Sequence, residues 1–229
     1  MSSVPDQSQS FTDLAVAAYC PRQLYYARRA DDRSPPASVG RVRDLAFRYP
    51  ELREADDATL AALPIERPLD EYRAALDALA TRDEWAELAD PTARDVHLSG
   101  RDCHGVAHKL LDLGDDGPPT PALVSPGDPP DRGVWEPQRV KAVAAAKALS
   151  WERGAAVERA LVEYPAHGVV RTVRATTRNR AAYRKALRVA ETLDGPPPRL
   201  RDREKCESCA YRDRCGVTTR SLRSLLGLG

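Results

Sequence analysis

The chain of 229 residues lacks any long uncharged apolar run, and its mean hydropathy is −0.52. A membrane-spanning helix needs about 20 consecutive apolar residues, so the sequence predicts none. The polar stretch at residues 1–10 also lacks the apolar core of a secretion signal, and we therefore expect a cytoplasmic protein. With 13 glycines, 19 prolines and 42% hydrophobic residues, the composition excludes a collagen-like or fully disordered chain.

Neither sign of charge is in excess, because 35 Lys and Arg residues face 34 Asp and Glu residues. The net charge of +1 therefore indicates no class of partner. The charges are unevenly distributed, however: residues 170–229 contain 15 basic and 6 acidic side chains, whereas residues 1–169 have a net charge of −8. The acidic part is typical of a solvated helical surface, and the basic end is the part that could face a polyanion.

Cysteines are few and odd in number, at five. Without a secretion signal, this count favours a metal site or buried thiols over a disulfide framework. Cys206, Cys209 and Cys215 form a Cys-x2-Cys-x5-Cys cluster, which can supply three thiolates to one metal or iron–sulfur cluster. A closed site needs a fourth ligand, and the candidates are Cys20, Cys103, His97, His104, His108 and His167. The spacing alone does not separate zinc from iron–sulfur.

The order of expected elements predicts an α/β fold with a mixed sheet between helices. Residues 1–10 are expected to be a disordered tail, followed by a helix capped by Ser10 or Thr12 and a second helix that begins at Pro21. Further helices are predicted near 39–49, 57–63, 69–89, 135–151 and 177–193, and strands near 95–98, 105–113, 122–124, 156–164 and 169–175. Leu222, Leu225 and Leu226 predict a terminal amphipathic helix.

Two motifs resemble those of CRISPR-associated RecB-like exonucleases, which belong to the PD-(D/E)XK nuclease superfamily. The first is a Cys-Pro-Arg-x-x-Tyr signature that runs from Cys20 to Tyr25, and the second is Cys-x-x-Cys-x-Tyr-x-x-x-Cys from Cys206 to Cys215. The resemblance implies a restriction-endonuclease-like core over residues 11–229. It also implies a helical insert at about 39–93 and a cluster-binding segment at 199–229.

By this resemblance, a 4Fe–4S cluster is bound by Cys20, Cys206, Cys209 and Cys215, with Cys103 left as a buried thiol beside a strand. The resemblance further implies DNA as the substrate, in single strands or at ends, and CRISPR integrase proteins as partners. The alternative function is a zinc-stapled, non-catalytic interaction module without a nucleic-acid role.

The nuclease motif of this family is only partly present. Asp112 lies where the family has its metal-binding Asp, and Gln138 matches the Gln of the following helix. The Glu-x-Lys motif is replaced by Ser125-Pro126-Gly127, and Arg43 or Asp44 stands in place of an early His. Two interpretations follow. In the first, the exonuclease activity that depends on Mg²⁺ or Mn²⁺ is lost. In the second, the missing charges have moved to Glu136, Lys141 or Asp128.

The basic end is the expected nucleic-acid surface. Arginine heads suit phosphate oxygens, and Arg22, Lys205, Arg212 and Arg214 surround the cysteine motifs. A second basic run, Arg178, Arg180, Arg184, Lys185 and Arg188, follows one predicted helix. A solvated helix face explains such runs equally well, and nearby tyrosines could either stack on bases or pack.

Overall fold

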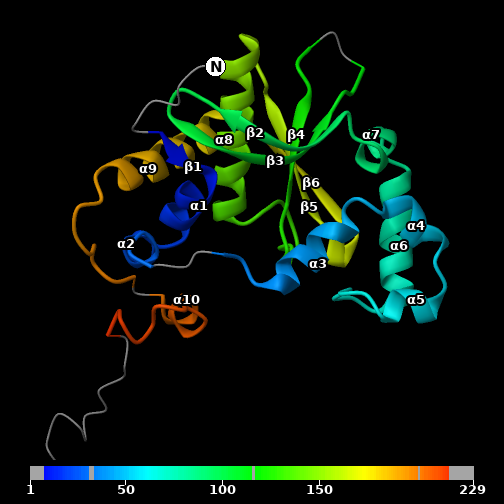
Figure 1. Cartoon of the computed structure of the whole chain (residues 1–229), viewed down its shortest axis with the longest axis horizontal. Coiled ribbons are helices and arrows are strands. Elements are labelled where there is room, and N and C mark those ends of the chain that lie inside the picture. Colours follow the sequence, from blue (N-terminus) through cyan, green and yellow to red (C-terminus); the bar gives the residue numbers. More distant parts are fainter. Residues whose placement is uncertain (1–7, 31–33, 115–116, 201, 217–229) are drawn as a thin grey trace, which may run out of the picture.

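A computed structural model describes residues 8–30, 34–114, 117–200 and 202–216, except for the side chain of Arg203. Its centre is a mixed six-stranded sheet with helices on both faces, which confirms the predicted α/β class (Figure 1). The strands are β1 (Gln9–Ser10), β2 (Ala93–Ser99), β3 (Cys103–Leu111), β4 (Thr120–Val124), β5 (Arg159–Tyr164) and β6 (Val169–Arg174).

Strand β3 organises the sheet. It pairs with β2 in an antiparallel hairpin along one edge, while its other edge pairs with β1 near its start and with β4 near its end. Strands β4 and β5 are parallel, and the connection between them passes through helix α8 (Glu136–Arg153), as parallel pairing requires. Strand β6 returns antiparallel to β5 after a short 3₁₀ turn at Pro165–His167.

One face of the sheet is covered by α1 (Phe11–Tyr19), α8 and α9 (Thr177–Glu191). Helix α1 begins where the Ser10 hydroxyl accepts a hydrogen bond from the Asp13 amide, and Thr176 caps α9 in the same way. The buried side of α8 is rich in alanine between Ala142 and Ala148, which lets its backbone approach the strands closely. The short helix α2 (Pro21–Ala27) follows α1 directly.

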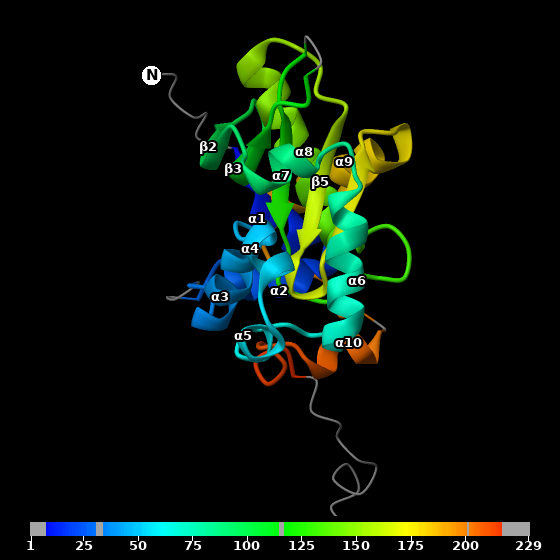
Figure 2. The same ribbon diagram turned by 90° about the vertical axis from the view of Figure 1, so that its right-hand side faces the viewer.

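The other face is covered by the helices of the insert: α3 (Ala37–Leu45), α4 (Tyr49–Glu54), α5 (Asp57–Ala61), α6 (Leu69–Ala80) and α7 (Trp85–Ala89). Their buried leucines and tyrosines pack on Leu111, Ala122, Val124 and Leu161 of the strands. Helices α6 and α7 lie in front of the strands in Figure 2.

A buried ion pair fastens this insert to the sheet. Lys109 of β3 and Glu163 of β5 are both fully buried, with 2.8 Å between Lys109 Nζ and Glu163 Oε2. The same ammonium donates to the carbonyl oxygens of Ala46 at 2.5 Å and Leu88 at 2.8 Å. Burial lowers the pKa of Lys109 while Glu163 raises it, and burial raises the pKa of Glu163 against the opposing effect of Lys109.

The structure differs from the sequence-based expectation in two places. The helix expected over 69–89 is divided, because Thr81 ends α6 and α7 begins at Trp85. Strand β1 lies in the segment that was expected to be a disordered tail, with Gln9 paired to Cys103 and Ser10 to His104. The expected terminal amphipathic helix lies outside the described residues.

Among the helices of the described chain, none has the length and apolar character needed to cross a membrane.

Candidate functional site

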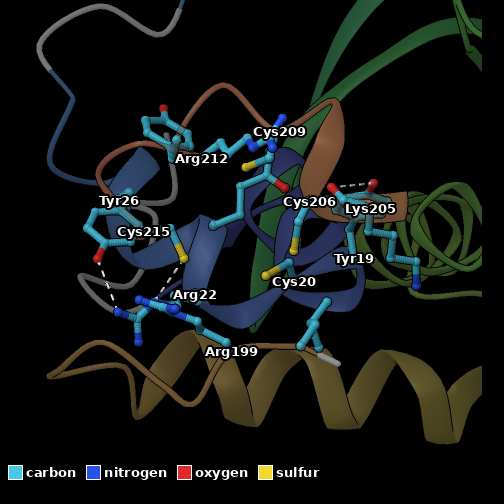
Figure 3. Close-up of a pocket in the computed structure, with 13 residues that line it drawn as sticks. Tyr19, Cys20, Arg22, Tyr26, Arg199, Lys205, Cys206, Cys209, Arg212 and Cys215 are labelled. Atoms are coloured by element: carbon cyan, nitrogen blue, oxygen red, sulfur yellow. Dashed lines mark hydrogen bonds between the residues drawn. The ribbon is translucent and has the colours of Figure 1, made fainter. Parts of the chain in front are cut away.

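Four cysteines from opposite ends of the chain line one pocket (Figure 3). Cys20 comes from the junction of α1 and α2, whereas Cys206, Cys209 and Cys215 come from α10 (Arg203–Glu207) and the turns that follow it. Both ribbon views place α10 next to α2. The two motifs that the sequence analysis joined by resemblance are therefore neighbours in space.

The backbone at Cys20 is fixed by the helices on both sides. Its amide donates to the Val16 carbonyl at 2.8 Å, and its own carbonyl accepts from the Leu24 amide at 3.2 Å. Pro21 starts α2, where the absent amide hydrogen costs nothing because a first-turn amide has no partner within the helix. The extended conformation of Cys20, with φ −157° and ψ 109°, separates the two helices and directs its thiol toward the pocket (Figure 3).

The three later cysteines are held by a succession of tight turns. Asp202 caps α10 by accepting from the Lys205 amide at 3.4 Å. The amide of Cys209 then donates to the Cys206 carbonyl at 3.3 Å, and the amide of Cys215 donates to Tyr211 at 2.8 Å. These turns bring residues 206, 209 and 215 to the same side of the segment, facing Cys20.

Side chains of α1 and α2 bind this cysteine segment directly. Arg22 donates to the Pro197 carbonyl at 2.7 Å and from Nε to Cys215 Sγ at 3.1 Å, while Tyr19 donates to the Lys205 carbonyl at 3.4 Å. The rings of Tyr26 and Tyr211 stack with centroids 6.1 Å apart. These contacts use most of the polar groups around the pocket for holding the segment in place.

The residues expected to bind nucleic acid have unequal surroundings. Arg22 is committed to Cys215 and Pro197, Lys205 lies over the Tyr19 ring at 5.4 Å, and Arg214 lies over the Tyr26 ring at 5.8 Å. Arg212 is exposed and lines the pocket. Arg214 and Lys205 are exposed as well, and Lys205 also pairs with Asp202, with 3.7 Å between Lys205 Nζ and Asp202 Oδ2.

The thiols of the pocket affect one another electrostatically. The pKa of Cys206 is raised by desolvation and then by the negative charge that Cys20, Cys215 and Cys209 acquire as thiolates. A cation bound by all four sulfurs removes this mutual repulsion and stabilises the thiolates. Four thiolates with adjacent arginines form a donor set that suits a soft metal or an iron–sulfur cluster.

The sulfur atoms are spread rather than gathered at one point. Among the described residues, one group of His, Cys, Asp or Glu side chains has three ligand atoms within 4.8 Å of one another, and it contains no cysteine. No three of the four sulfurs in the pocket are therefore that close to one another. Tetrahedral zinc with Zn–S bonds of about 2.3 Å holds its thiolates roughly 4 Å apart. No three of the four sulfurs are therefore as close together as the thiolates around a bound zinc ion.

Cys103 lies apart from this pocket. It is fully buried in β3, where its thiol donates to the Ala144 carbonyl at 3.4 Å. Desolvation raises the pKa of Cys103 to about 12, so the thiolate that a metal requires is disfavoured there.

The structure does not bring Asp112 together with the other nuclease candidates. In the β3–β4 hairpin, Lys109 pairs with Ala122 and Leu111 with Thr120, so Asp112 follows β3 at the end where β4 begins. Ser125 follows the opposite end of β4, roughly 20 Å away along the strand at about 3.3 Å per residue. Asp112 is exposed, and its carboxylate accepts from the Gly114 amide at 3.3 Å.

Gln138, Lys141 and Ser125 do share a cavity, which lies between the end of β4 and the start of α8. Gln138 Nε2 donates to Ser125 Oγ at 3.4 Å, and burial lowers the pKa of Lys141. None of the described residues that line this cavity carries a carboxylate. The cavity therefore lacks the ligands that a catalytic Mg²⁺ or Mn²⁺ needs.

His108 lies beside this cavity, and the sequence analysis did not connect it with Gln138 and Lys141. Its Nδ1 accepts from the Val124 amide at 3.0 Å, so the neutral ring carries its proton on Nε2. Burial lowers the pKa of His108 to about 3, with Lys141 and Arg43 adding to the effect. Arg43 itself pairs with Asp95. The register of β3 with β4, in which Lys109 pairs with Ala122, places His108 rather than Asp112 beside the end of β4.

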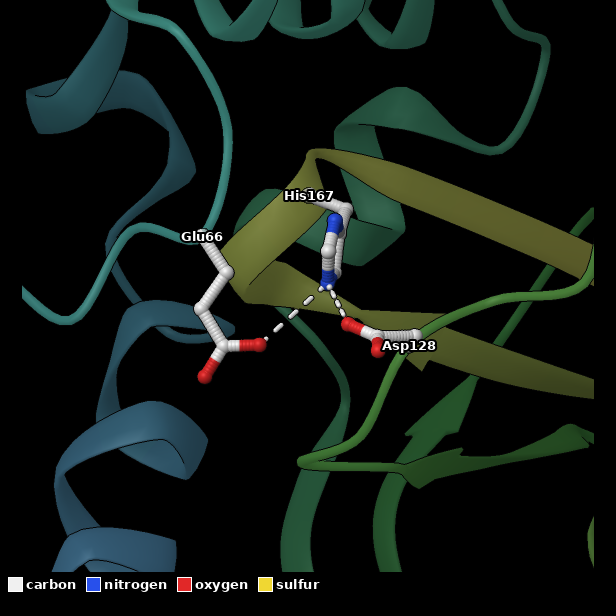
Figure 4. Close-up of side chains that lie close together, drawn as sticks. All are labelled: Glu66, Asp128 and His167. Atoms are coloured by element: carbon white, nitrogen blue, oxygen red, sulfur yellow. Dashed lines mark ion pairs between the residues drawn. The ribbon is translucent and has the colours of Figure 1, made fainter.

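The other relocated carboxylates lie elsewhere. Glu136 is exposed and lines a neighbouring hollow with Trp135 and Lys205, which shares Gln138 with the cavity above. Asp128 joins Glu66 and His167, whose Nε2 lies 3.0 Å from Asp128 Oδ1 and 3.5 Å from Glu66 Oε2 (Figure 4). One imidazole and two carboxylates could hold a divalent cation, and a protonated His167 explains the same contacts as ion pairs. This cluster joins three loops.

Comparison with protein-family models and with curated proteins found no match for this chain.

Proposed function

We propose that this protein is a DNA-binding iron–sulfur protein with a RecB-like nuclease fold. Its partners in this proposal are DNA ends or single strands and CRISPR integrase proteins. The observation that carries the proposal is the pocket shared by Cys20, Cys206, Cys209 and Cys215. These cysteines would hold a 4Fe–4S cluster, which supplies a covalent link between segments 186 residues apart in the sequence.

The role of the cluster in this proposal is structural. A link between the two ends of the chain removes loop-closure entropy from the unfolded state and fixes the segment after residue 199 against α1 and α2. Arg22 and Tyr19 orient that segment through their hydrogen bonds to Pro197, Cys215 and Lys205. The exposed Arg212 and Lys205 then face solvent at a fixed position, where phosphates could reach them.

The same proposal includes the loss of DNA cleavage. Cleavage by this superfamily needs carboxylates around a divalent metal. The cavity with Gln138 and Lys141 offers hydroxyl, amide and ammonium groups instead, and Asp112 lies at the far end of the hairpin. The chain would therefore act as a DNA-binding subunit that delivers or holds DNA ends while another protein acts on them.

Metal analysis of anaerobically purified protein tests the cluster. We expect a brown protein with iron and acid-labile sulfide in about fourfold ratio to the chain. Cys20→Ser should lose most of the iron, whereas Cys103→Ser is the matched control that should keep it, because Cys103 lies outside the pocket. Colourless protein with one zinc per chain would contradict the iron–sulfur assignment and favour the zinc-stapled module.

A nuclease assay tests the non-catalytic part. We expect wild-type protein to bind single-stranded DNA but not to cleave it with Mg²⁺ or Mn²⁺. Cleavage that Asp112→Ala abolishes would contradict this part and support the metal role of Asp112. Cleavage that survives Asp112→Ala but not Lys141→Ala would instead assign catalysis to the cavity at the start of α8.

A further inference from the structure

A basic groove lies between α8 and α9. These two helices lie away from α10 and its cysteines in Figure 1. The groove has a volume of about 740 Å³ and contains Lys147 and Trp151 of α8. Arg180, Arg184 and Arg188 of α9 line its other side. Neither the proposed cluster nor the cavity at Gln138 uses any of these residues.

The three arginines form a regular row. They are four residues apart on α9, so each lies about 6 Å further along the helix axis on nearly the same face. All three are exposed, and within the described residues no carboxylate pairs with them. Uncompensated charges of one sign that repeat along a groove are suited to a polyanion whose charges also repeat, because each guanidinium can meet a phosphate.

Lys147 adds a fourth cation on the facing helix. Its Nζ lies 5.4 Å from the centre of the Tyr183 ring, and the Tyr183 hydroxyl donates to Asp102 at 2.8 Å. Asp102 is the one carboxylate among the groove's described residues, and it forms no ion pair with the three arginines. Four cations therefore line the groove against one carboxylate.

Trp151 gives the groove an aromatic surface. Its side chain is 61% exposed, which is unusual for the largest apolar side chain and leaves an indole face open next to the row of cations. Bases that are not paired can stack on such a ring, and stacking accepts any base. Bases in a duplex are already stacked on one another, so an isolated indole favours single strands.

We propose that the α8–α9 groove binds single-stranded nucleic acid, with phosphates on Arg180, Arg184 and Arg188 and a base on Trp151. This inference rests on the proposed DNA-binding function and gives it a different surface from the arginines around the cysteines. The strand would follow α9 while its bases face α8.

The first experiment compares two pairs of substitutions on the same helix. Arg180→Gln with Arg184→Gln removes two charges from the groove, whereas Arg178→Gln with Lys185→Gln removes two exposed charges of α9 that lie outside the groove. Binding to a 20-nucleotide oligothymidine is measured by fluorescence anisotropy in the iron-loaded protein over a range of salt concentrations. The melting temperature and the iron content of each variant establish that it is folded.

For the groove pair, we expect the dissociation constant to rise about ten- to a hundredfold, as two lost phosphate contacts predict. The slope of log affinity against log salt should decrease by about 1.4, because each contact to a single strand contributes about 0.7. The control pair should change both quantities much less. Equal effects of the two pairs would overturn the groove.

The second experiment tests stacking. Trp151→Ala should weaken binding about tenfold while leaving the salt slope unchanged, because an indole contributes no counterion release. Addition of oligothymidine should quench the fluorescence of the wild type more than that of Trp151→Phe. An unchanged affinity in Trp151→Ala would remove the base from the proposal and overturn the stacking part.

The other outcomes are also distinguishable. If wild-type protein binds DNA and the groove variants bind it equally well, the groove inference fails and the proposed function stands. If wild-type protein binds neither oligothymidine nor oligouridine, both fail, although the metal content remains a separate result. Poly-glutamate binding as tight as oligothymidine binding would overturn the inference in favour of an acidic protein partner, and parallel titration with oligouridine shows whether DNA or RNA is preferred.

Discussion

Replacement of Lys109 by methionine should destabilise the protein severely. The substitution keeps the volume of the side chain but leaves Glu163 fully buried without its 2.8 Å partner, and it removes the donor from the carbonyls of Ala46 and Leu88. Breaking one side of a buried ion pair costs about 3–5 kcal/mol. For a chain of this length, that corresponds to a fall in melting temperature of roughly 6–20 °C.

Urea unfolding followed by circular dichroism measures this loss. In Lys109→Met, burial raises the pKa of Glu163 without an opposing cation, so the folded state takes up a proton at a higher pH than the unfolded state does. The variant should therefore lose less stability relative to wild type at pH 5 than at pH 8. Lys109→Met with Glu163→Leu should recover at least half of the loss, because the unpaired charge is gone.

Two results would refute this reasoning. A single variant within 1 kcal/mol of wild type, on the order of a surface substitution, would mean that the buried pair does not hold the insert. A double variant less stable than the single one would mean that Glu163 is tolerated without Lys109. The coupling energy from the full cycle of four proteins separates the pair from the contributions of Ala46 and Leu88.

Three further predictions concern single positions. Cys103 should remain unreactive toward a thiol reagent at pH 8 in the folded, metal-free protein, because its pKa is raised to about 12. Four thiols should react before unfolding and the fifth only after unfolding, and five fast-reacting thiols would contradict this. The pKa of His108 is lowered to about 3 in the folded state, so between about pH 6.5 and about pH 3 only the unfolded chain takes up its proton. His108→Asn should therefore make the free energy of unfolding fall less steeply with decreasing pH in this range. An unchanged slope would show that His108 protonates in the folded state. Gly105→Ala should cost about 1–3 kcal/mol, since a β-carbon there would overlap the ring of Phe11, and a melting temperature equal to that of wild type would contradict the packing of α1 on β3.

Much of the fold follows from local sequence signals. Ser10 and Thr176 carry the hydroxyls that begin α1 and α9, and Pro21 begins α2, so these three boundaries could be predicted from single residues. The alternating and apolar runs around residues 96, 107, 123 and 162 predicted the strands for the same reason. Local chemistry decided these elements, and distant contacts did not override it.

Strand β1 could not be predicted in this way. Gln9 and Ser10 are polar and too few to show a period, and they become a strand only because β3 offers a free edge beside Cys103 and His104. The division of the helix expected over 69–89 also involves a distant residue, because the carbonyl of Leu88 in α7 accepts a hydrogen bond from Lys109 of β3.

For the candidate site, the proximity of Cys20 to the other three cysteines came from a family resemblance and not from spacing. The displacement of Asp112 had a readable signal that was overlooked. In a hairpin, residues at equal distances from the turn are opposite each other, so Asp112 and Ser125 could not be neighbours across it. The role of Lys109 had no signal at all, because its partners lie at 46, 88 and 163.

The pocket that joins Cys20 to Cys215 also has a consequence for the order of events during synthesis. Residues 8–191 contain the sheet and the helices α1 to α9, so this part can fold while the ribosome is still adding the last cysteines. Cys206, Cys209 and Cys215 follow all of these elements in the chain. The four-cysteine pocket can therefore be completed only after the sheet and its covering helices have been synthesised, and these elements form without the later cysteine segment.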